Sequence, residues 1–264
     1  MRVMCYRCFW PQSLCWCASL RPMATRTRFV FLMHPKEFKE EKAGTGRLTH
    51  LCLPNSEIRM GVGFDGDAAV QALINDPHNL PVLLYPGMEA LNLSEAGSVE
   101  QGAGSSEKPA AGSALHALRS QLEHHQLVVF LLDATWRGAR KMLQQSPSLQ
   151  RLPRIMFTPS APSRYIIKQQ PVEGCLSTLE AVHELLTVLA RTGLDAYPLP
   201  AQLLDVFQRM QDFQIKCAAD PERGGYRRHP YSAPEERIPA HGRSGKRRTQ
   251  HLRLPLQSRP EGTS

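Results

Sequence analysis

Six consecutive apolar residues, 127 to 132, constrain the fold more than any other feature of the chain. The run is far too short to cross a membrane, which takes about 20 apolar residues. It also lacks the alternation of a strand with one wet face, so both of its faces must be covered, as in a parallel sheet between helices. Similar runs at 28–33, 80–85 and 154–157 predict further strands, and 48–53 is a candidate fifth.

Three other segments have helical periodicity. Ser177 and Glu180 stand at capping-box spacing ahead of apolar residues that recur every three or four positions until Gly193. A second helix is expected over 203 to 217, and a third begins at Trp136 and continues the stripe through Ala139 and Leu143. Strands that alternate with helices predict an α/β domain, with a mostly parallel sheet and flanking helices.

Asp133, Thr135 and Trp136 directly follow the central apolar run. In open α/β folds the ligand crevice lies outside the carboxyl ends of the strands, so these polar side chains form a candidate site. The alternative is that Asp133 caps the next helix. For Trp136, stacking on an adenine or on a target base competes with a core position, which its helical spacing favours.

Three further polar segments fall at or near predicted strand ends, at 42–47, at 85–87, and at 163–168 with its continuation 174–181. Their glycines and hydroxyls suit a small polar cofactor beside phosphate-binding cations. The chain contains no Walker-type Gly-Lys-Ser/Thr, and Gly-Thr-Gly at 44–46 is too short for a dinucleotide fingerprint. Nucleotide hydrolysis is therefore unsupported.

Four of the seven cysteines crowd the N-terminus as Cys5, Cys8, Cys15 and Cys17. No secretory signal is evident, because cysteines interrupt the stretch where an apolar signal region would lie, so we expect a cytoplasmic protein and disfavour disulfides. Four thiolates at this density predict a closed, structural Zn²⁺ site in a knuckle over residues 1–22. Free thiols or redox pairs are the alternative. The aromatic residues between them can pack on the core or stack on nucleobases.

The net charge of +8 and the pI near 9.3 suit a polyanionic partner. Residues 217 to 264 hold ten Lys/Arg against five Asp/Glu, which predicts a basic, disordered tail from 218 to 264. A Gly- and Ser-rich stretch, about 94–114, predicts a flexible insert in the domain that covers 23–217. No membrane segment is expected, and no obligate protein partner can be inferred.

Several motifs together resemble the DTW-domain family. They are Cys-x2-Cys and Cys-x-Cys in the first seventeen residues, Thr-Gly-Arg-Leu at 45–48, Leu-Asp-Ala-Thr-Trp at 132–136 followed by Ala-Arg-Lys-Met at 139–142, and Leu-Ser-Thr-Leu-Glu-Ala at 176–181. The motifs occur in family order over roughly residues 5 to 217. The insert and the tail fall outside the pattern.

The resemblance implies a SPOUT-like, knotted domain that binds S-adenosyl-L-methionine. Family members are tRNA-uridine aminocarboxypropyltransferases, which transfer the 3-amino-3-carboxypropyl group to N3 of a uridine and release methylthioadenosine. Carried over by motif, the cofactor-binding residues are Tyr85, Pro86, Gly87, Asp133, Thr135, Trp136, Cys175, Leu176, Ser177 and Thr178, and the helix start at Ser177 suits a carboxylate.

Asp133 is the catalytic candidate, either as the base that removes the N3 proton or as an anchor for the cofactor's ammonium group. Arg164 and Lys168 are expected to contact the cofactor's carboxylate or tRNA phosphates. The remaining basic residues expected to face tRNA are Arg47, Arg137, Arg140 and Lys141, with solvated surface charge as the alternative for each. An RNA methyltransferase of the SPOUT class and a non-catalytic, zinc-containing RNA-binding protein remain alternative functions.

Overall fold

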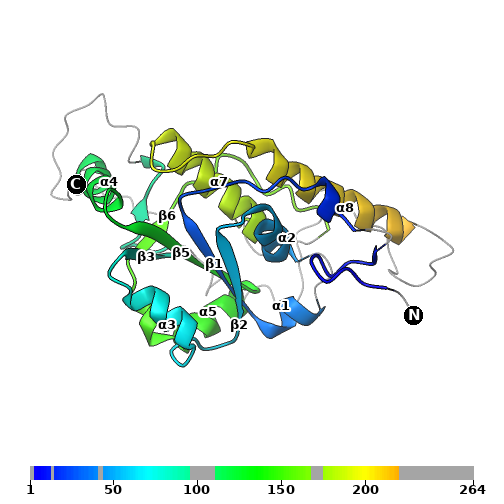
Figure 1. The fold of residues 1–264 in the computed structure, drawn as a ribbon, viewed down its shortest axis with the longest axis horizontal. Coiled ribbons are helices and arrows are strands. Elements are labelled where there is room, and N and C mark those ends of the chain that lie inside the picture. The colour runs from blue at the N-terminus through cyan, green and yellow to red at the C-terminus, as the bar shows by residue number, and fades with distance from the viewer. Residues whose placement is uncertain (1–2, 13–14, 41–43, 96–110, 168–174, 220–264) are drawn as a thin grey trace, which may run out of the picture.

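The computed structural model describes residues 3–12, 15–40, 44–95, 111–167 and 175–219 (Figure 1). Residues 96–110 of the predicted insert and 220–264 of the predicted tail lie outside these ranges, as does Lys168. In the part of the chain that is described, no helix is both long and apolar enough to span a membrane.

The described strands form one parallel sheet of six, in the order β2-β1-β5-β3-β6-β4. Their bounds are β1 (Arg28–Met33), β2 (Ser56–Met60), β3 (Asn79–Leu84), β4 (Leu91–Asn92), β5 (Gln126–Asp133) and β6 (Arg154–Met156). The four strands expected around 28–33, 80–85, 127–132 and 154–157 are confirmed, and so is the parallel sheet.

Helices cover both faces of the sheet (Figure 1). One layer contains α2 (Thr45–Cys52), α4 (Ala111–Leu122), α7 (Thr178–Arg191) and α8 (Pro200–Ala219), and the other contains α3 (Ala68–Asn75), α5 (Trp136–Gln144) and α6 (Pro147–Gln150), while α1 (Pro35–Glu40) follows β1. Along β5, Val129 and Leu131 belong to the first hydrophobic cluster, and Val128 and Phe130 to the second. The apolar run is continuous because each of its faces packs under a different helical layer.

The prediction of a strand at 48–53 is wrong, because those residues continue α2. Leu48 and Cys52 are buried four positions apart, which is helical spacing, and both pack in the first cluster. The strand in this part of the chain is β2, whose sequence contains no continuous apolar run. It lies at the sheet edge and carries Glu57 between Arg28 and Arg59, at 2.7 and 2.6 Å.

The predicted helices 177–193 and 203–217 are confirmed as α7 and α8. Ser177 and Glu180 form the capping box at the start of α7, with each side chain bonded to the other residue's backbone N–H. After α7, Gly193 adopts φ of 71°, a left-handed conformation that glycine reaches without steric cost. The predicted insert extends too far, since α4 begins at Ala111.

Several neighbouring strands have chain connections that leave toward opposite faces of the sheet, and β1 and β5 are one such pair. From β1 the chain continues through α1 into α2 in the first layer, whereas from the neighbouring β5 it enters α5 in the second. Adjacent strands whose connections leave toward opposite faces open a crevice between their carboxyl ends, which is where open α/β sheets bind ligands. For β1 and β5 this position lies between Met33 and Asp133, which are paired residues.

Candidate active site and metal centre

Asp133 ends β5 at this position and is buried, with 7% of its surface exposed. Its Oδ1 accepts a hydrogen bond of 2.6 Å from the Thr178 hydroxyl, and its backbone oxygen accepts one of 3.0 Å from the N–H of His34. Asp133 therefore joins the residue that follows β1, through its backbone, to the start of α7, through its carboxylate. The hydrogen bond from Thr178 joins the Asp-x-Thr-Trp motif to the Leu-Ser-Thr-Leu-Glu motif.

The first turn of α2 packs against the same carboxylate through Gly46. A Cβ atom at position 46 would lie 2.2 Å from Oδ2 of Asp133 and 3.3 Å from the Met33 side chain. Only glycine fits this approach. The segment 42–47 was expected at or just beyond a strand end, and its residues 45–47 form the first turn of α2.

The alternative role for Asp133, as cap of the next helix, is wrong. Thr135 is the N-cap of α5, and its hydroxyl accepts a hydrogen bond of 3.2 Å from the N–H of Gly138. The core position favoured for Trp136 is also wrong. Ala139 and Leu143 of its stripe are buried, but Trp136 is only half-buried and belongs to neither hydrophobic cluster.

Glu180 does more than close its capping box. Its carboxylate also accepts hydrogen bonds from the Ser163 hydroxyl at 2.9 Å and from the Arg164 N–H at 2.6 Å. Gln211 of α8 donates to the Arg164 carbonyl at 3.0 Å. These bonds fix the loop at 163–164 beside the α7 start, while the Arg164 side chain itself is exposed. The sequence did not reveal this role of Glu180, because its partners lie 16 and 17 residues away.

Tyr85, Pro86 and Gly87 follow β3, the other neighbour of β5. The Arg154 guanidinium lies 5.8 Å from the centre of the Tyr85 ring, and it lies 3.4 Å from where a Cβ of Gly87 would stand. Burial raises the pKa of Tyr85, although the charges of Arg154 and Arg140 oppose that shift. Arg154 was not among the predicted site residues.

Arg47 is not on the surface, where it was expected to face tRNA. Its exposed fraction is 8%, and its guanidinium packs against the rings of Phe9 and Phe38, 4.8 Å from each centroid. Nη2 donates to the Phe38 carbonyl at 2.5 Å, and Nε has no hydrogen-bond partner. Burial lowers the pKa of Arg47, while the nearby charges of Asp133 and Cys8 raise it.

The three other basic candidates within the described ranges, Arg137, Arg140 and Lys141, are exposed on α5. Cys175 and Ser177 are buried before and at the cap of α7, and Leu176 is half-buried between them. All of these residues belong to segments that begin at the carboxyl edge of the sheet.

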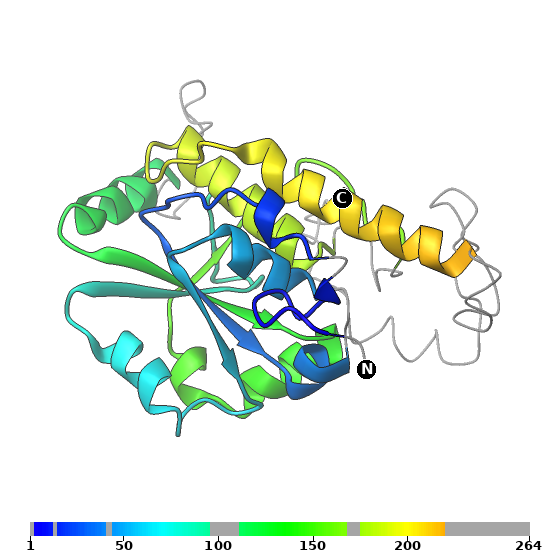
Figure 2. The same ribbon diagram turned by 45° about the vertical axis from the view of Figure 1, so that its right-hand side comes forward.

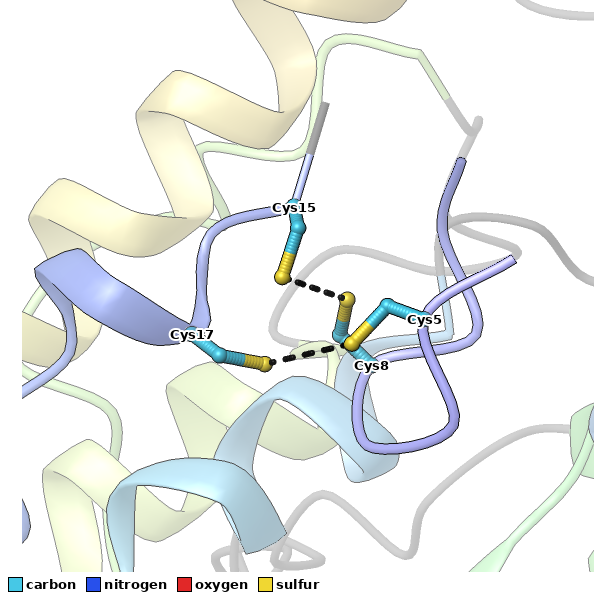
Figure 3. Close-up of side chains that lie close together, drawn as sticks. All are labelled: Cys5, Cys8, Cys15 and Cys17. Carbon is cyan, nitrogen blue, oxygen red and sulfur yellow. Dashed lines mark hydrogen bonds between the residues drawn. The ribbon is translucent and has the colours of Figure 1, made fainter. Parts of the chain in front are cut away.

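The four N-terminal cysteines form one cluster (Figure 3). Their sulfur atoms all lie within 4.8 Å of one another, with 3.9 Å between Cys5 and Cys17 and 3.7 Å between Cys8 and Cys15. Tetrahedral zinc with Zn–S bonds of about 2.3 Å requires sulfurs about 3.8 Å apart, so the cluster could bind such an ion. Backbone hydrogen bonds from Cys8 and Arg7 lower the pKa of Cys5 to about 6, whereas burial raises the pKa of Cys8 and Cys17. A cation at the centre would favour the thiolate form of all four.

The knuckle that carries these cysteines packs on the domain beside α1 and α2 (Figure 2). Trp10 is buried in the first cluster, 4.6 Å from the Trp16 ring and 5.2 Å from Phe213 of α8. Trp10 and Trp16 thus pack on the core, whereas Tyr6 is 95% exposed and Phe9 47% exposed. Phe9 adopts φ of 58°, a left-handed conformation that is rare for a large side chain.

Comparison with known proteins explains this combination of motifs. The profile of the DTW domain matches residues 2–215. The chain belongs to the DTW-domain family. The match includes the knuckle, the Asp133 site and most of α8, so all three parts of the DTW chain belong to the DTW domain. No solved structure matches it.

Curated relatives support the assignment. The DTW chain is 29% identical to tRNA-uridine aminocarboxypropyltransferase 2 of Mus musculus over 83% of its own length and 68% of that protein. It is 31% identical to the Drosophila melanogaster protein of that name over 71% of its length and 67% of the relative. Identity to tRNA-uridine aminocarboxypropyltransferase A of Arabidopsis thaliana is 25% over 81% of this chain and 82% of the relative.

Proposed function

We propose that this protein is a tRNA-uridine aminocarboxypropyltransferase that uses S-adenosyl-L-methionine. The observation that carries the proposal is the buried Asp133 at the carboxyl ends of β1 and β5, held by Thr178 and approached by Gly46. Three motifs of the matched family meet at this one carboxylate. The names of the curated relatives supply the reaction class.

In the proposed reaction, N3 of a tRNA uridine forms a bond to the γ-carbon of the methionine moiety as the bond from that carbon to sulfur breaks. The N3 proton leaves, and neutral methylthioadenosine departs. All three carbons on the sulfonium are electrophilic, so the chain selects the product by holding one of them in line with N3 at about 3–3.5 Å. The protein's role is therefore mainly one of orientation.

Asp133 has two candidate roles in this step. As a base, its carboxylate accepts the N3 proton, which makes N3 nucleophilic. As an anchor, it binds the ammonium group of the amino-acid end. In either role the Thr178 hydrogen bond fixes the orientation of the carboxylate.

The same proposal assigns the remaining contacts. Tyr85 to Gly87, Thr135, Trp136 and the residues from Cys175 to Thr178 bind the co-substrate, in a domain related to the knotted SPOUT fold. The exposed Arg137, Arg140 and Lys141 of α5 contact tRNA phosphates. A cytoplasmic location fits the seven cysteines, none of which is in a disulfide.

The metal proposed for Cys5, Cys8, Cys15 and Cys17 is Zn²⁺ in a structural role. Four sulfur ligands fill a tetrahedral shell and leave no position for water, so no reaction step occurs there. The cysteines come from two short segments, and the ion would fix these segments to each other and to the domain (Figure 3).

The test uses purified protein, tRNA and S-adenosyl-L-methionine labelled either on the carboxyl carbon or on the methyl group. We expect label in tRNA from the carboxyl carbon alone, a uridine nucleoside heavier by the aminocarboxypropyl group in mass spectrometry, and methylthioadenosine as by-product. Methyl label in tRNA together with S-adenosylhomocysteine would instead indicate a methyltransferase. Binding of tRNA without transfer would indicate a non-catalytic RNA-binding protein.

Asp133→Asn provides the matched variant, because the amide oxygen can still accept the Thr178 hydrogen bond. We expect the transfer rate to fall at least about 100-fold, the usual effect of losing a positioned acid or base. Binding of tRNA and the melting temperature should change little. A rate within twofold of wild type would remove Asp133 from the mechanism.

A further inference from the structure

Arg47 is a buried cation whose side chain is incompletely satisfied. Of the donors on its guanidinium, Nη2 bonds to the Phe38 carbonyl, whereas Nε is buried and has no partner. A buried donor without an acceptor costs about 1–3 kcal/mol, and more when the group is charged. Such a group is typical of a site whose acceptor is a ligand.

The surroundings of Arg47 restrict the direction from which a ligand can approach. The guanidinium carbon lies 4.8 Å from the centre of each ring, Phe9 and Phe38, and the two ring centres are 5.8 Å apart, so both rings pack against the same side of it. The unpartnered Nε remains for hydrogen bonding. Nε and Nη2 share one edge of a guanidinium, and that edge binds a carboxylate through two parallel hydrogen bonds.

The position of Arg47 brings its side chain close to the proposed active site. Arg47 directly follows Gly46, the residue whose backbone approaches Oδ2 of Asp133. Burial lowers the pKa of Arg47, and the nearby charge of Asp133 opposes that shift. A cation and an anion therefore lie close together at the carboxyl ends of β1 and β5. This pair complements an α-amino acid group, which carries one carboxylate and one ammonium.

We propose that Arg47 binds the carboxylate of the aminocarboxypropyl group that the enzyme transfers. The inference rests on the proposed function, because that function supplies S-adenosyl-L-methionine as the ligand. An exposed fraction of 8% is too small for contact with a polynucleotide backbone, so Arg47 takes a small carboxylate rather than a tRNA phosphate. Asp133, in its anchoring role, meets the ammonium of the same amino-acid end.

Phe9 gives the N-terminal knuckle a part in this site. It follows the metal-ligand candidate Cys8, holds a left-handed backbone conformation, and its N–H donates to the Cys5 carbonyl at 2.9 Å. Its ring contacts Phe38 edge to face, with centroids 5.8 Å apart, as well as Arg47. The turn that contains two of the four cysteines therefore also positions one wall of the carboxylate site.

The test measures binding by calorimetry with three ligands, S-adenosyl-L-methionine, its decarboxylated analogue and methylthioadenosine. Wild type should bind the first at least about 10-fold more tightly than the second. Arg47→Met should weaken binding of S-adenosyl-L-methionine about 10- to 100-fold, as expected for losing hydrogen bonds to a charged group, and should leave methylthioadenosine binding within about twofold. Arg151→Met, an exposed arginine just before β6, is the matched control.

Arg47→Lys is the second variant, for the case that Arg47→Met fails to fold. Lysine keeps the positive charge but cannot bind a carboxylate through two parallel hydrogen bonds. It should reduce the preference for the carboxylate-bearing ligand by about 10-fold. Equal binding of both ligands by wild type, or a preference that survives at Arg47 and disappears in Arg164→Met, would overturn the inference. Transfer without this preference refutes the inference alone. Carboxylate-dependent binding without transfer refutes the proposed function alone, and no binding of S-adenosyl-L-methionine refutes both.

Discussion

A buried carboxylate is stable only where donors or cations reach it, and Asp133 obtains them from distant parts of the chain. Thr178 lies 45 residues away and donates at 2.6 Å, while Gly46 and Arg47 approach from α2. The approaches of Thr178 and Gly46 depend on short distances that the neighbouring side chains permit. Small changes of volume beside Asp133 should therefore affect the reaction before they affect the fold.

Gly46→Ala tests this expectation, because it adds a single methyl group beside Asp133. The added methyl would lie 2.2 Å from Oδ2 of Asp133, so the carboxylate or the first turn of α2 must move. We expect transfer to fall at least about 10-fold, because such misplacement weakens catalysis strongly. Overpacking should reduce the free energy of unfolding by about 1–3 kcal/mol. Both are measurable by single-turnover assays and urea denaturation.

Gly66→Ala is the control, since a Cβ at position 66 meets nothing within 4 Å. It should change stability by less than about 0.5 kcal/mol and leave transfer unchanged. If Gly46→Ala behaved like Gly66→Ala, the close approach between α2 and Asp133 would have no functional meaning.

At the scale of elements, the central strands were predictable and the edge was not. β1, β3 and β5 are apolar on both faces because helices cover both, which leaves a continuous signal in the sequence. β2 lies at the edge and alternates charged with apolar residues around Glu57, so no run marks it. The run at 48–53 was wrongly predicted to be a strand because α2 is buried on most sides. A short apolar stretch is compatible with a buried helix as well as with a strand.

In the candidate site, too, some positions could be predicted from the sequence and others could not. Asp133 was predictable, since it ends the most apolar strand, and so was the capping box of α7. The burial of Arg47 was not, because it depends on Phe9 and Phe38 from two other segments. Sequence placed the knuckle and the Asp133 site in separate domains. Packing joins them, through Trp10 in the main cluster and Phe9 against Arg47.

The knuckle should therefore couple metal content to co-substrate binding. Cys8→Ser, which alters the buried member of the cluster, should lower bound zinc and reduce the melting temperature by at least about 5 °C, since 1 kcal/mol corresponds to about 2–4 °C in a domain of this size. It should also weaken S-adenosyl-L-methionine binding, because Phe9 no longer holds Arg47. Elemental analysis, calorimetry and thermal unfolding provide the three readouts.

Cys217→Ser, at the end of α8, is the matched control and should leave all three unchanged. A Cys8→Ser protein that is free of metal and yet binds the co-substrate normally would separate the knuckle from the site.

At the scale of the whole molecule, two half-buried histidines make stability depend on pH. Burial lowers the pKa of His50 and of His183 below the ordinary value of 6.5, although the nearby charges of Glu57 and Glu184 oppose these shifts. Each histidine forms a hydrogen bond of 2.8 Å, to Ser56 and to Tyr197. The unfolded chain therefore binds protons more readily than the folded one.

The contribution of the two neutral histidines to the free energy of unfolding should consequently be complete above about pH 6.5. It should be lost as the pH falls through their lowered pKa values. Thermal unfolding at pH 7.5 and 5.5 measures the loss. Replacing both histidines with glutamine should reduce the difference between the two melting temperatures, and an unchanged difference would assign the pH dependence to other groups.

The strongest whole-molecule prediction concerns charge. Residues 217 to 264 hold ten Lys/Arg against five Asp/Glu, so they contribute much of the net charge of +8. Phosphate binding by Lys and Arg releases counterions, and removing one such cation from the tRNA surface should lower the slope of log K against log salt by about 0.7–0.9. A chain ending at Ala219, where α8 ends, should bind tRNA more weakly at 50 mM salt and differ less at 200 mM.

A full-length chain with the Lys/Arg residues beyond position 219 replaced by glutamine is the control that separates charge from length. It should behave like the truncated chain, with the melting temperature and S-adenosyl-L-methionine binding of both unchanged. The Arg137, Arg140 and Lys141 face of α5 should then account for the salt dependence that remains. If truncation left tRNA affinity equal at both salt concentrations, the tRNA surface would lie entirely on the folded domain.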